Sequence, residues 1–240
     1  MKALLLLLLL PFTCMYGQIL TERDRADVID EVLADRFDNL LPTLMDRSDI
    51  DMWVVISREY NEDPVIKTML PSTWLNARRR TILVFYRNKE ENTIEKLAVA
   101  RYNVGKNIIS AWDKEKQPDQ WARLLEIIEE RNPSKIGLNY SDNFGLADGI
   151  VKTDYEAFIS KLSSAQQAKV VSAQNLAVGW LETRTALEMK YFEQLVDVTH
   201  DIIKDAFSYK VITPGVTTTD DVVWYLRQRV TDMGLETWFH

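Results

Sequence analysis

Side chains suited to metal or acid–base chemistry are sparse in this sequence. It holds two histidines, His200 and His240, and one cysteine, Cys14. Because the two histidines fall in different predicted elements, one chain cannot build a zinc site of His and Cys from them. His200 lies in DVTHDIIKD beside helix carboxylates, and we prefer a solvated or packing role for it over metal binding. The sequence contains no GxSxG, GxGxxG, HExxH or phosphate-loop motif.

A run of arginines supplies a second candidate. In NARRRT, Arg78, Arg79 and Arg80 follow one another. Guanidinium groups bind phosphates and carboxylates through paired hydrogen bonds, so the run could hold a phosphate or a carboxylate terminus. The alternative is a charged flank that leads into an apolar strand and keeps the edge of that strand soluble. We prefer the charged flank and keep anion binding open.

The composition is that of a soluble globular protein. The 240 residues are 46% hydrophobic and 27% charged, which suits one large domain or two medium ones. The formal net charge is −7. Such an acidic balance argues against nucleic acids and anionic membrane surfaces as partners, because both attract clusters of Lys and Arg.

The first 17 residues, MKALLLLLLLPFTCMYG, are typical of a secretory signal peptide. One Lys precedes a leucine run that is too short to span a bilayer comfortably. We expect cleavage after Gly17 and export to the periplasm or the extracellular space. Lipidation at Cys14 is disfavoured because Pro-Phe-Thr, rather than small residues, precedes it. The mature chain would then contain no cysteine for disulfides, metal ligation or nucleophilic catalysis.

Hydrophobic periodicity predicts an α/β domain over residues 18–175. Its first helix, 21–45, is expected to end or kink at Pro42. Thr153 and Glu156 stand in capping-box spacing at the start of another helix. The remaining predicted elements are strands at 52–57, 80–87 and 96–104, a helix at 119–131, and strands at 135–140 and 169–173.

A second, incomplete pattern occupies residues 176–240. Thr185 and Glu188 have capping-box spacing at the head of a long helix that runs to about Phe207. A turn at Pro214-Gly215 leads into a helix at 220–233. An apolar strand at 235–240 follows, and because strand backbone needs partners we expect a chain cut at that point. The alternative, that the protein ends naturally at His240, stays open.

Residues 181–240, from LETRTALEMKYF to GLETWFH, resemble the opening of the pita-bread metallopeptidase domain. This is the fold of Xaa-Pro aminopeptidases, prolidases, methionine aminopeptidases and creatinase. Arg184 and Glu188 begin a long helix, and TPG followed by Val-Thr matches the family's inter-helix loop. A second amphipathic helix, a glycine and an apolar strand come next. The preceding part resembles the creatinase-type N-terminal α/β domain.

The resemblance implies a metallopeptidase that removes the N-terminal residue from peptides, before proline, and the signal peptide implies that it is exported. In that family two divalent ions (Mn, Zn or Co), held by two Asp, one His and two Glu, activate a bridging water. None of those ligand motifs falls within this sequence, so no metal ligand is assigned and the chain alone is expected to be inactive. His240 is a candidate for the family's substrate-contacting histidine. The alternative is an ordinary strand histidine.

Three interpretations remain after the resemblance. The first is the metallopeptidase, acting on a peptide substrate, with a homo-oligomer left open. The second is a non-peptidase relative, either a creatinase-like hydrolase or a metal-free pseudoenzyme. The third is a secreted binding module whose α/β domain holds a ligand.

Overall fold

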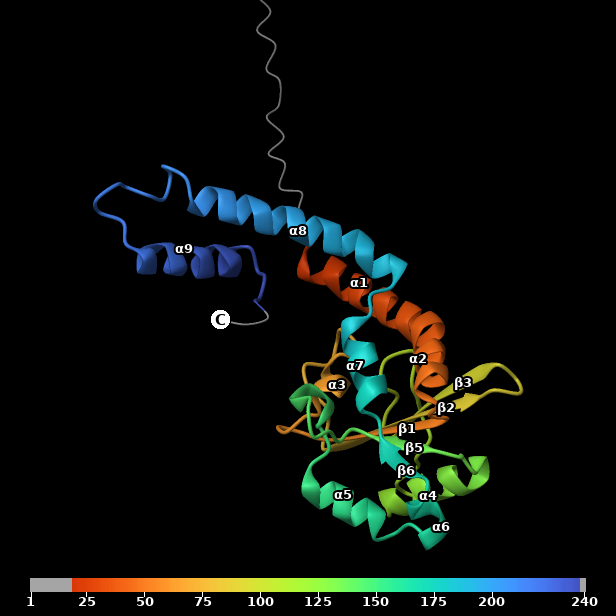
Figure 1. Ribbon diagram of the computed structural model, residues 1–240. Coiled ribbons are helices and arrows are strands. Elements are labelled where there is room, and N and C mark those ends of the chain that lie inside the picture. The colour runs from red at the N-terminus through yellow and green to blue at the C-terminus, as the bar shows by residue number, and fades with distance from the viewer. Residues whose placement is uncertain (1–18, 238–240) are drawn as a thin grey trace, which may run out of the picture. The chain divides into compact units, whose positions relative to one another are not determined.

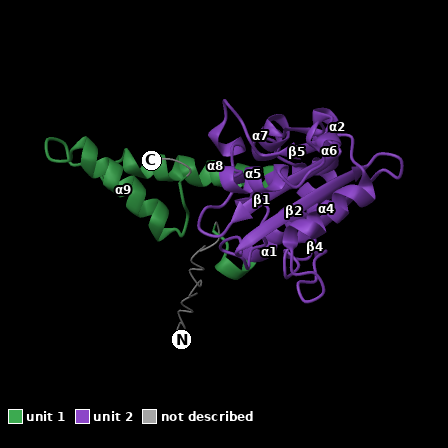
Figure 2. Ribbon diagram, turned by 90° about the horizontal axis from the view of Figure 1, so that it is seen from below, with its two compact units in different colours: residues 1–24, 189–240 green, residues 25–188 purple. Residues whose placement is uncertain are grey.

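A computed structural model describes residues 19–237 of the protein. The expected signal peptide, Cys14 and His240 therefore lie outside the described residues. The described chain divides into two compact units (Figure 2). Unit 2 spans Arg25–Glu188, and unit 1 contains the chain from Met189 onward together with the residues up to Asp24. The domain bounds expected from the sequence, 18–175 and 176–240, stay a prediction.

A six-stranded mixed sheet forms the centre of unit 2 (Figure 1). Its strand order is β4-β3-β2-β1-β5-β6. The expected hairpin is present, since β2 pairs antiparallel with both β1 and β3, whereas β5 joins β1 in parallel. The mixed sheet with its helices confirms the predicted α/β class. The strands are β1 (Met52–Arg58), β2 (Arg80–Asn88), β3 (Thr93–Val99), β4 (Ile109–Ser110), β5 (Ile136–Leu138) and β6 (Val170–Ser172).

Alternation along β1 fills two cores, one on each face of the sheet. Trp53 and Val55 enter the first core, and Met52, Val54 and Ile56 enter the second. Successive strand side chains point to opposite faces, so a strand buried on both faces is apolar throughout. This is why MWVVIS carries no polar residue before Ser57.

Helices cover each face (Figure 1). The first core lies under α1 (Glu22–Asp35), η1 (Arg36–Leu40), α2 (Leu41–Ser48), α3 (Pro64–Lys67) and α7 (Gln174–Glu182), and the second under α4 (Gln120–Arg131) and α5 (Lys152–Ile159). In the first core the Phe37 ring stacks on Phe85 at 5.5 Å and on Trp180 at 5.4 Å. The short segments η2 (Gly145–Ala147) and α6 (Ser164–Gln167) complete the unit.

The predicted helix at 21–45 is interrupted earlier than expected. A π-helical turn at Arg36–Leu40 separates α1 from α2, and Pro42 stands in the first turn of α2. A proline lacks the N–H that a helix interior donates to the preceding turn, and a π-helical turn shifts that bonding by one residue. The backbone stays helical from η1 into α2, and Leu41 N donates to Arg36 O, so the hydrogen-bond pattern changes directly before Pro42 and the helix continues past it.

The two predicted capping boxes have different outcomes. Glu188 accepts a hydrogen bond from Thr185 N at 2.8 Å, and Glu188 N donates to Thr185 Oγ1 at 3.3 Å, so the box at α8 (Ala186–Ala206) is confirmed. The box at Thr153 is wrong, because α5 begins at Lys152 with Val151 as its N-cap. The helix starts one residue before the threonine, which leaves its hydroxyl inside the first turn.

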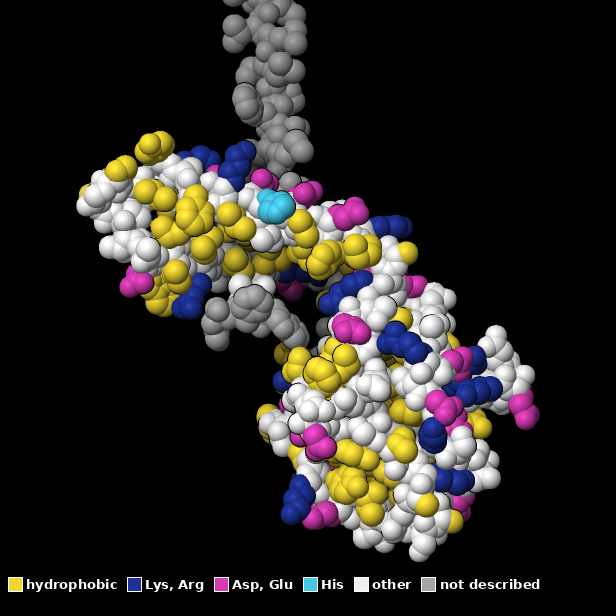
Figure 3. Space-filling model, viewed as in Figure 1, with side chains coloured by type: hydrophobic (Ala, Val, Ile, Leu, Met, Phe, Trp, Pro, Cys, Tyr) yellow, Lys and Arg dark blue, Asp and Glu magenta, His cyan; other side chains and the backbone are white. Residues whose placement is uncertain are grey.

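Two helices dominate unit 1. After α8 a turn carries Gly215 at φ +77°, and α9 (Thr219–Asp232) begins at a capping box of Thr218 and Asp221. Apolar side chains gather over both helices (Figure 3). Residues 235–237 are not in a strand, and the rest of the predicted strand lies outside the described residues. Over residues 19–237, no helix has the length and apolarity needed to cross a membrane.

Candidate functional site

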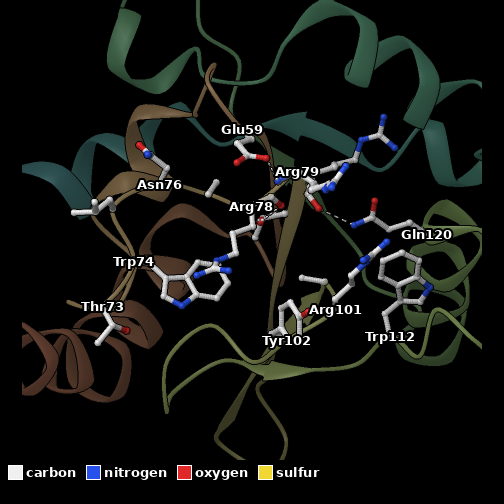
Figure 4. A pocket seen from close by; sticks show the side chains of 15 residues that line it. Glu59, Thr73, Trp74, Asn76, Arg78, Arg79, Arg101, Tyr102, Trp112 and Gln120 are labelled. Carbon is white, nitrogen blue, oxygen red and sulfur yellow. Dashed lines mark hydrogen bonds between the residues drawn. The ribbon is translucent and has the colours of Figure 1, made fainter.

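A pocket of about 690 Å³ lies in unit 2, where the loop before β2 meets the segment after β3. Figure 4 shows Trp74 and Arg78 on one side of it and Trp112 and Gln120 on the other. Its charged lining consists of four arginines and one glutamate, so the ionised side chains sum to +3. The charged residues are Arg78, Arg79, Arg80, Arg101 and Glu59.

Backbone hydrogen bonds hold the arginine run in place. Arg79 N donates to Glu59 Oε2 at 3.0 Å, and Glu59 N donates back to Arg79 O at 2.6 Å. Arg78 N and Arg78 O both bond to Thr81 Oγ1, at 3.2 and 3.0 Å. Arg79 has φ +53°, a left-handed conformation that a side chain with a Cβ disfavours. The surrounding bonds therefore maintain a conformation that the loop would not adopt alone.

Arg80 is fixed by a buried carboxylate. Asp154 is fully buried; it accepts from Arg58 Nε at 2.6 Å and forms an ion pair with Arg80 Nη2 at 3.1 Å. The Arg80 guanidinium also lies over the Trp121 ring at 4.7 Å, and its Nε is buried without a hydrogen-bond partner. Of the four arginines, Arg80 alone has its charge neutralised by an ion pair among the described residues.

The strand register explains why Arg101 joins this pocket. Ile82 pairs with Val99, so the start of β2 and the chain after β3 meet at one end of the hairpin. Arg80 and Arg101 then come to the same place although they are distant in sequence. Sequence reasoning missed Arg101, although counting outward from an assumed hairpin register would have found it.

Aromatic side chains form the walls of the pocket. The Arg78 guanidinium stacks over Trp74 at 5.0 Å, and Trp112 is held by a bond from its Nε1 to Gln117 O at 2.7 Å. Tyr102 is exposed at 60%. Flat rings and guanidinium planes together suit a ligand with charged groups and an apolar part.

Asp63, a buried carboxyl with a raised pKa, lies outside this pocket. Burial raises the pKa of Asp63 to about 6, against hydrogen bonds that lower it. Its Oδ1 accepts from Val65 N and Ile66 N, which caps α3, and its Oδ2 accepts from Asn139 Nδ2 at 2.9 Å. Asn139 Oδ1 in turn accepts from Trp53 Nε1. Because every partner is structural and no solvent reaches it, Asp63 is a core cap and not a catalytic acid.

The structure brings together only part of what the sequence suggested. The three arginines of NARRRT do line one pocket. His200 is an exposed residue of α8, and His240 lies outside the described residues. Asp221 is occupied as the capping partner of Thr218. Across residues 19–237, no group of three or more His, Cys, Asp or Glu side chains could hold a metal ion.

Comparison with solved structures finds similarity to an Xaa-Pro dipeptidase from Bacillus anthracis. The similarity covers 87% of this chain and 50% of the dipeptidase, with 13% sequence identity and a TM-score of 0.46. The chain thus spans about half the length of that dipeptidase. No family model and no curated protein matches the sequence. The similarity concerns the fold alone.

Proposed function

We propose that this chain is the front part of an exported metallopeptidase of the Xaa-Pro aminopeptidase type. The enzyme would remove the N-terminal residue from peptides whose second residue is proline. The observation that carries the proposal is the combination of features in residues 181–240. These are an Arg and a Glu at the head of a long helix, a TPGVT loop, a second capped helix and a glycine.

The geometry of these residues supports that assignment. Glu188 forms both bonds of its capping box at the head of the 21-residue helix α8. In the loop, Val216 N and Thr217 N both donate to Thr213 O at 3.0 Å, and Gly215 has a positive φ. Each part of the motif therefore has a structural role in one helix–loop–helix unit.

The described residues do not fit a dinuclear metal centre. Asp220 and Asp221 belong to the first turn of α9, where Asp221 is a capping residue, and Glu236 stands apart from any group of ligands. Two divalent ions, when bound to the whole protein, would supply an activated water. The ligands would come from residues beyond this sequence. What the described residues can contribute is binding and positioning.

Two alternatives predict different sequences downstream. A creatinase-like hydrolase would have the metal ligands but no peptidase activity, and a pseudoenzyme would lack the ligands. A secreted binding module would instead be complete at His240 and would fold stably without metal. The arginine-lined pocket favours a binding role for the chain. A peptidase, a non-peptidase relative and a binding module could each have such a pocket.

Reading the coding DNA past the codon for His240 tests the proposal. We expect an open frame of roughly another domain's length, with two Asp, one His and two Glu in strand and loop patterns. A stop codon directly after His240 would contradict the proposal and favour the binding module. An open frame without the five ligands would favour the pseudoenzyme.

A further inference from the structure

We propose that the arginine pocket binds a small molecule that carries two or more anionic groups, either phosphate or carboxylate. The inference is independent of the peptidase proposal, because it rests on unit 2 alone. The pocket concentrates positive charge in an acidic protein. The whole chain has a formal charge of −7, whereas the lining side chains without an ion pair, Arg78, Arg79, Arg101 and Glu59, sum to +2. An anionic ligand would meet this local charge and not the average one.

Three of the guanidinium groups are available to a ligand. The side chains of Arg78, Arg79 and Arg101 are exposed, and none forms an ion pair with a carboxylate of residues 19–237. A guanidinium presents five donors and no acceptor, so each can bind two oxygen atoms of one anion. A ligand with two charged groups can therefore engage more than one arginine at once.

The arrangement costs free energy when the pocket is empty. Arg78, Arg79 and Arg101, none of which has an ion pair among the described residues, line the same pocket, and like charges held close together repel. Arg79 is held in a left-handed conformation by its two bonds to Glu59. Strain and repulsion that the fold maintains at one place are typical of binding sites. A bound anion would relieve the repulsion.

The surrounding groups limit the size and kind of ligand. The volume of about 690 Å³ is that of a small-molecule site. Trp74, Tyr102 and Trp112 offer ring faces and edges to an apolar part of the ligand. Glu59 supplies the single carboxylate among the described lining residues, and its Oε2 already accepts from Arg79 N. A cationic ligand would find little to pair with.

Isothermal titration calorimetry on the whole chain at low salt tests the inference, with inorganic pyrophosphate and citrate as the two probes. We expect saturable binding of at least one. Pyrophosphate alone would assign the site to phosphate compounds, and citrate alone to carboxylates. Binding should weaken as salt is added, because the pocket is open to solvent. Failure of both probes to bind saturably would overturn the proposal.

Matched variants locate the binding. Arg78→Gln and Arg101→Gln should each weaken the probe that binds by about tenfold or more, which is the effect of one lost charge-assisted hydrogen bond. The control is Arg227→Gln, because Arg227 is also exposed and also stacks on a tryptophan, Trp224 at 5.1 Å, but lies in unit 1. Equal weakening in the control would overturn the proposal.

A gain in affinity gives a test that misfolding cannot imitate. Glu59→Gln removes the carboxylate from the pocket while its amide oxygen can still accept from Arg79 N. We expect several-fold tighter binding of the same probe. Unchanged or weaker binding in a variant with an unaltered unfolding midpoint would contradict the inferred site.

Discussion

Arg36 Nη1 donates to Glu188 Oε2 at 2.7 Å, across 152 positions of the chain. Both side chains are largely buried, at 9% and 16% exposed. The same guanidinium donates to Thr183 O at 2.9 Å and to Trp180 O. Glu188 also accepts from Thr185 N, so one carboxylate joins the π-helical turn η1 to the head of α8. The ion pair fixes where the long helix begins.

Replacing Glu188 with Ala should lower the free energy of unfolding by about 3 kcal/mol, because it leaves a buried guanidinium without its counter-charge. The capping box at α8 is lost as well. Urea unfolding of the whole chain, followed by circular dichroism, measures the change. The control is Glu156→Ala, which breaks the exposed pair with Lys152 at 3.5 Å and should have little effect. Similar stability of the two variants would contradict the structural role of Glu188.

The buried Asp63 predicts a dependence of stability on pH. Burial raises its pKa from 3.8 to about 6 in the folded protein. Between these values the folded state keeps a proton that the unfolded chain has released. The proton bound to Asp63 therefore stabilises the folded state by about 3 kcal/mol at about pH 4 and below. This stabilisation is lost as the pH rises through about 6.

Asp63→Asn should abolish the fall in the free energy of unfolding as the pH rises, because the amide does not titrate. Free energies of unfolding measured in urea from pH 4 to pH 7, for the wild type and the variant, test this. Asp142→Asn, at an exposed carboxylate, should retain the slope of the wild type. The same slope in the Asp63 variant would mean that another group causes it.

The apolar surface of unit 1 predicts self-association. Phe192 and Leu195 of α8 are each 47% exposed, and Trp224 of α9 is 64% exposed. Contiguous apolar surface of this kind is typical of an interface. Sedimentation velocity over a range of concentrations should show association of the whole chain.

A double substitution, Phe192→Glu with Leu195→Glu, should shift the protein toward monomer. Gln194→Glu adds a charge on the same helix at an exposed polar position and should leave association unchanged. A wild-type chain that remains monomeric at every concentration would contradict the prediction.

Local patterns in the sequence account for most of the sheet. The six-residue run at 52–57 predicts β1, and the hairpin of β2 and β3 follows from two apolar runs around NKEEN. Asp119 and Asn132 cap the predicted helix α4 at its two ends. In each case the residues that decide the structure lie within the element or directly beside it.

Contacts between residues that are far apart in the chain could not be predicted from the sequence. Arg36 gave no signal in the sequence, because its partner Glu188 is brought near only by the fold. The bonds from Trp53 to Asn139 and from Asn139 to Asp63 depend in the same way on strands that are distant in the chain. The preferred interpretation of NARRRT as a charged flank rested on strand composition, which says nothing of the hairpin register that adds Arg101.

Hydrolysis of a short peptide with proline in second position is the most direct test of the proposed function. The assay compares the product of the complete reading frame with residues 1–240 alone, each with added manganese. The account predicts that the complete product releases the N-terminal residue, loses this activity with a chelator and regains it with metal, whereas residues 1–240 are inactive. Hydrolysis by residues 1–240, or none by a folded, metal-loaded complete product, would contradict it.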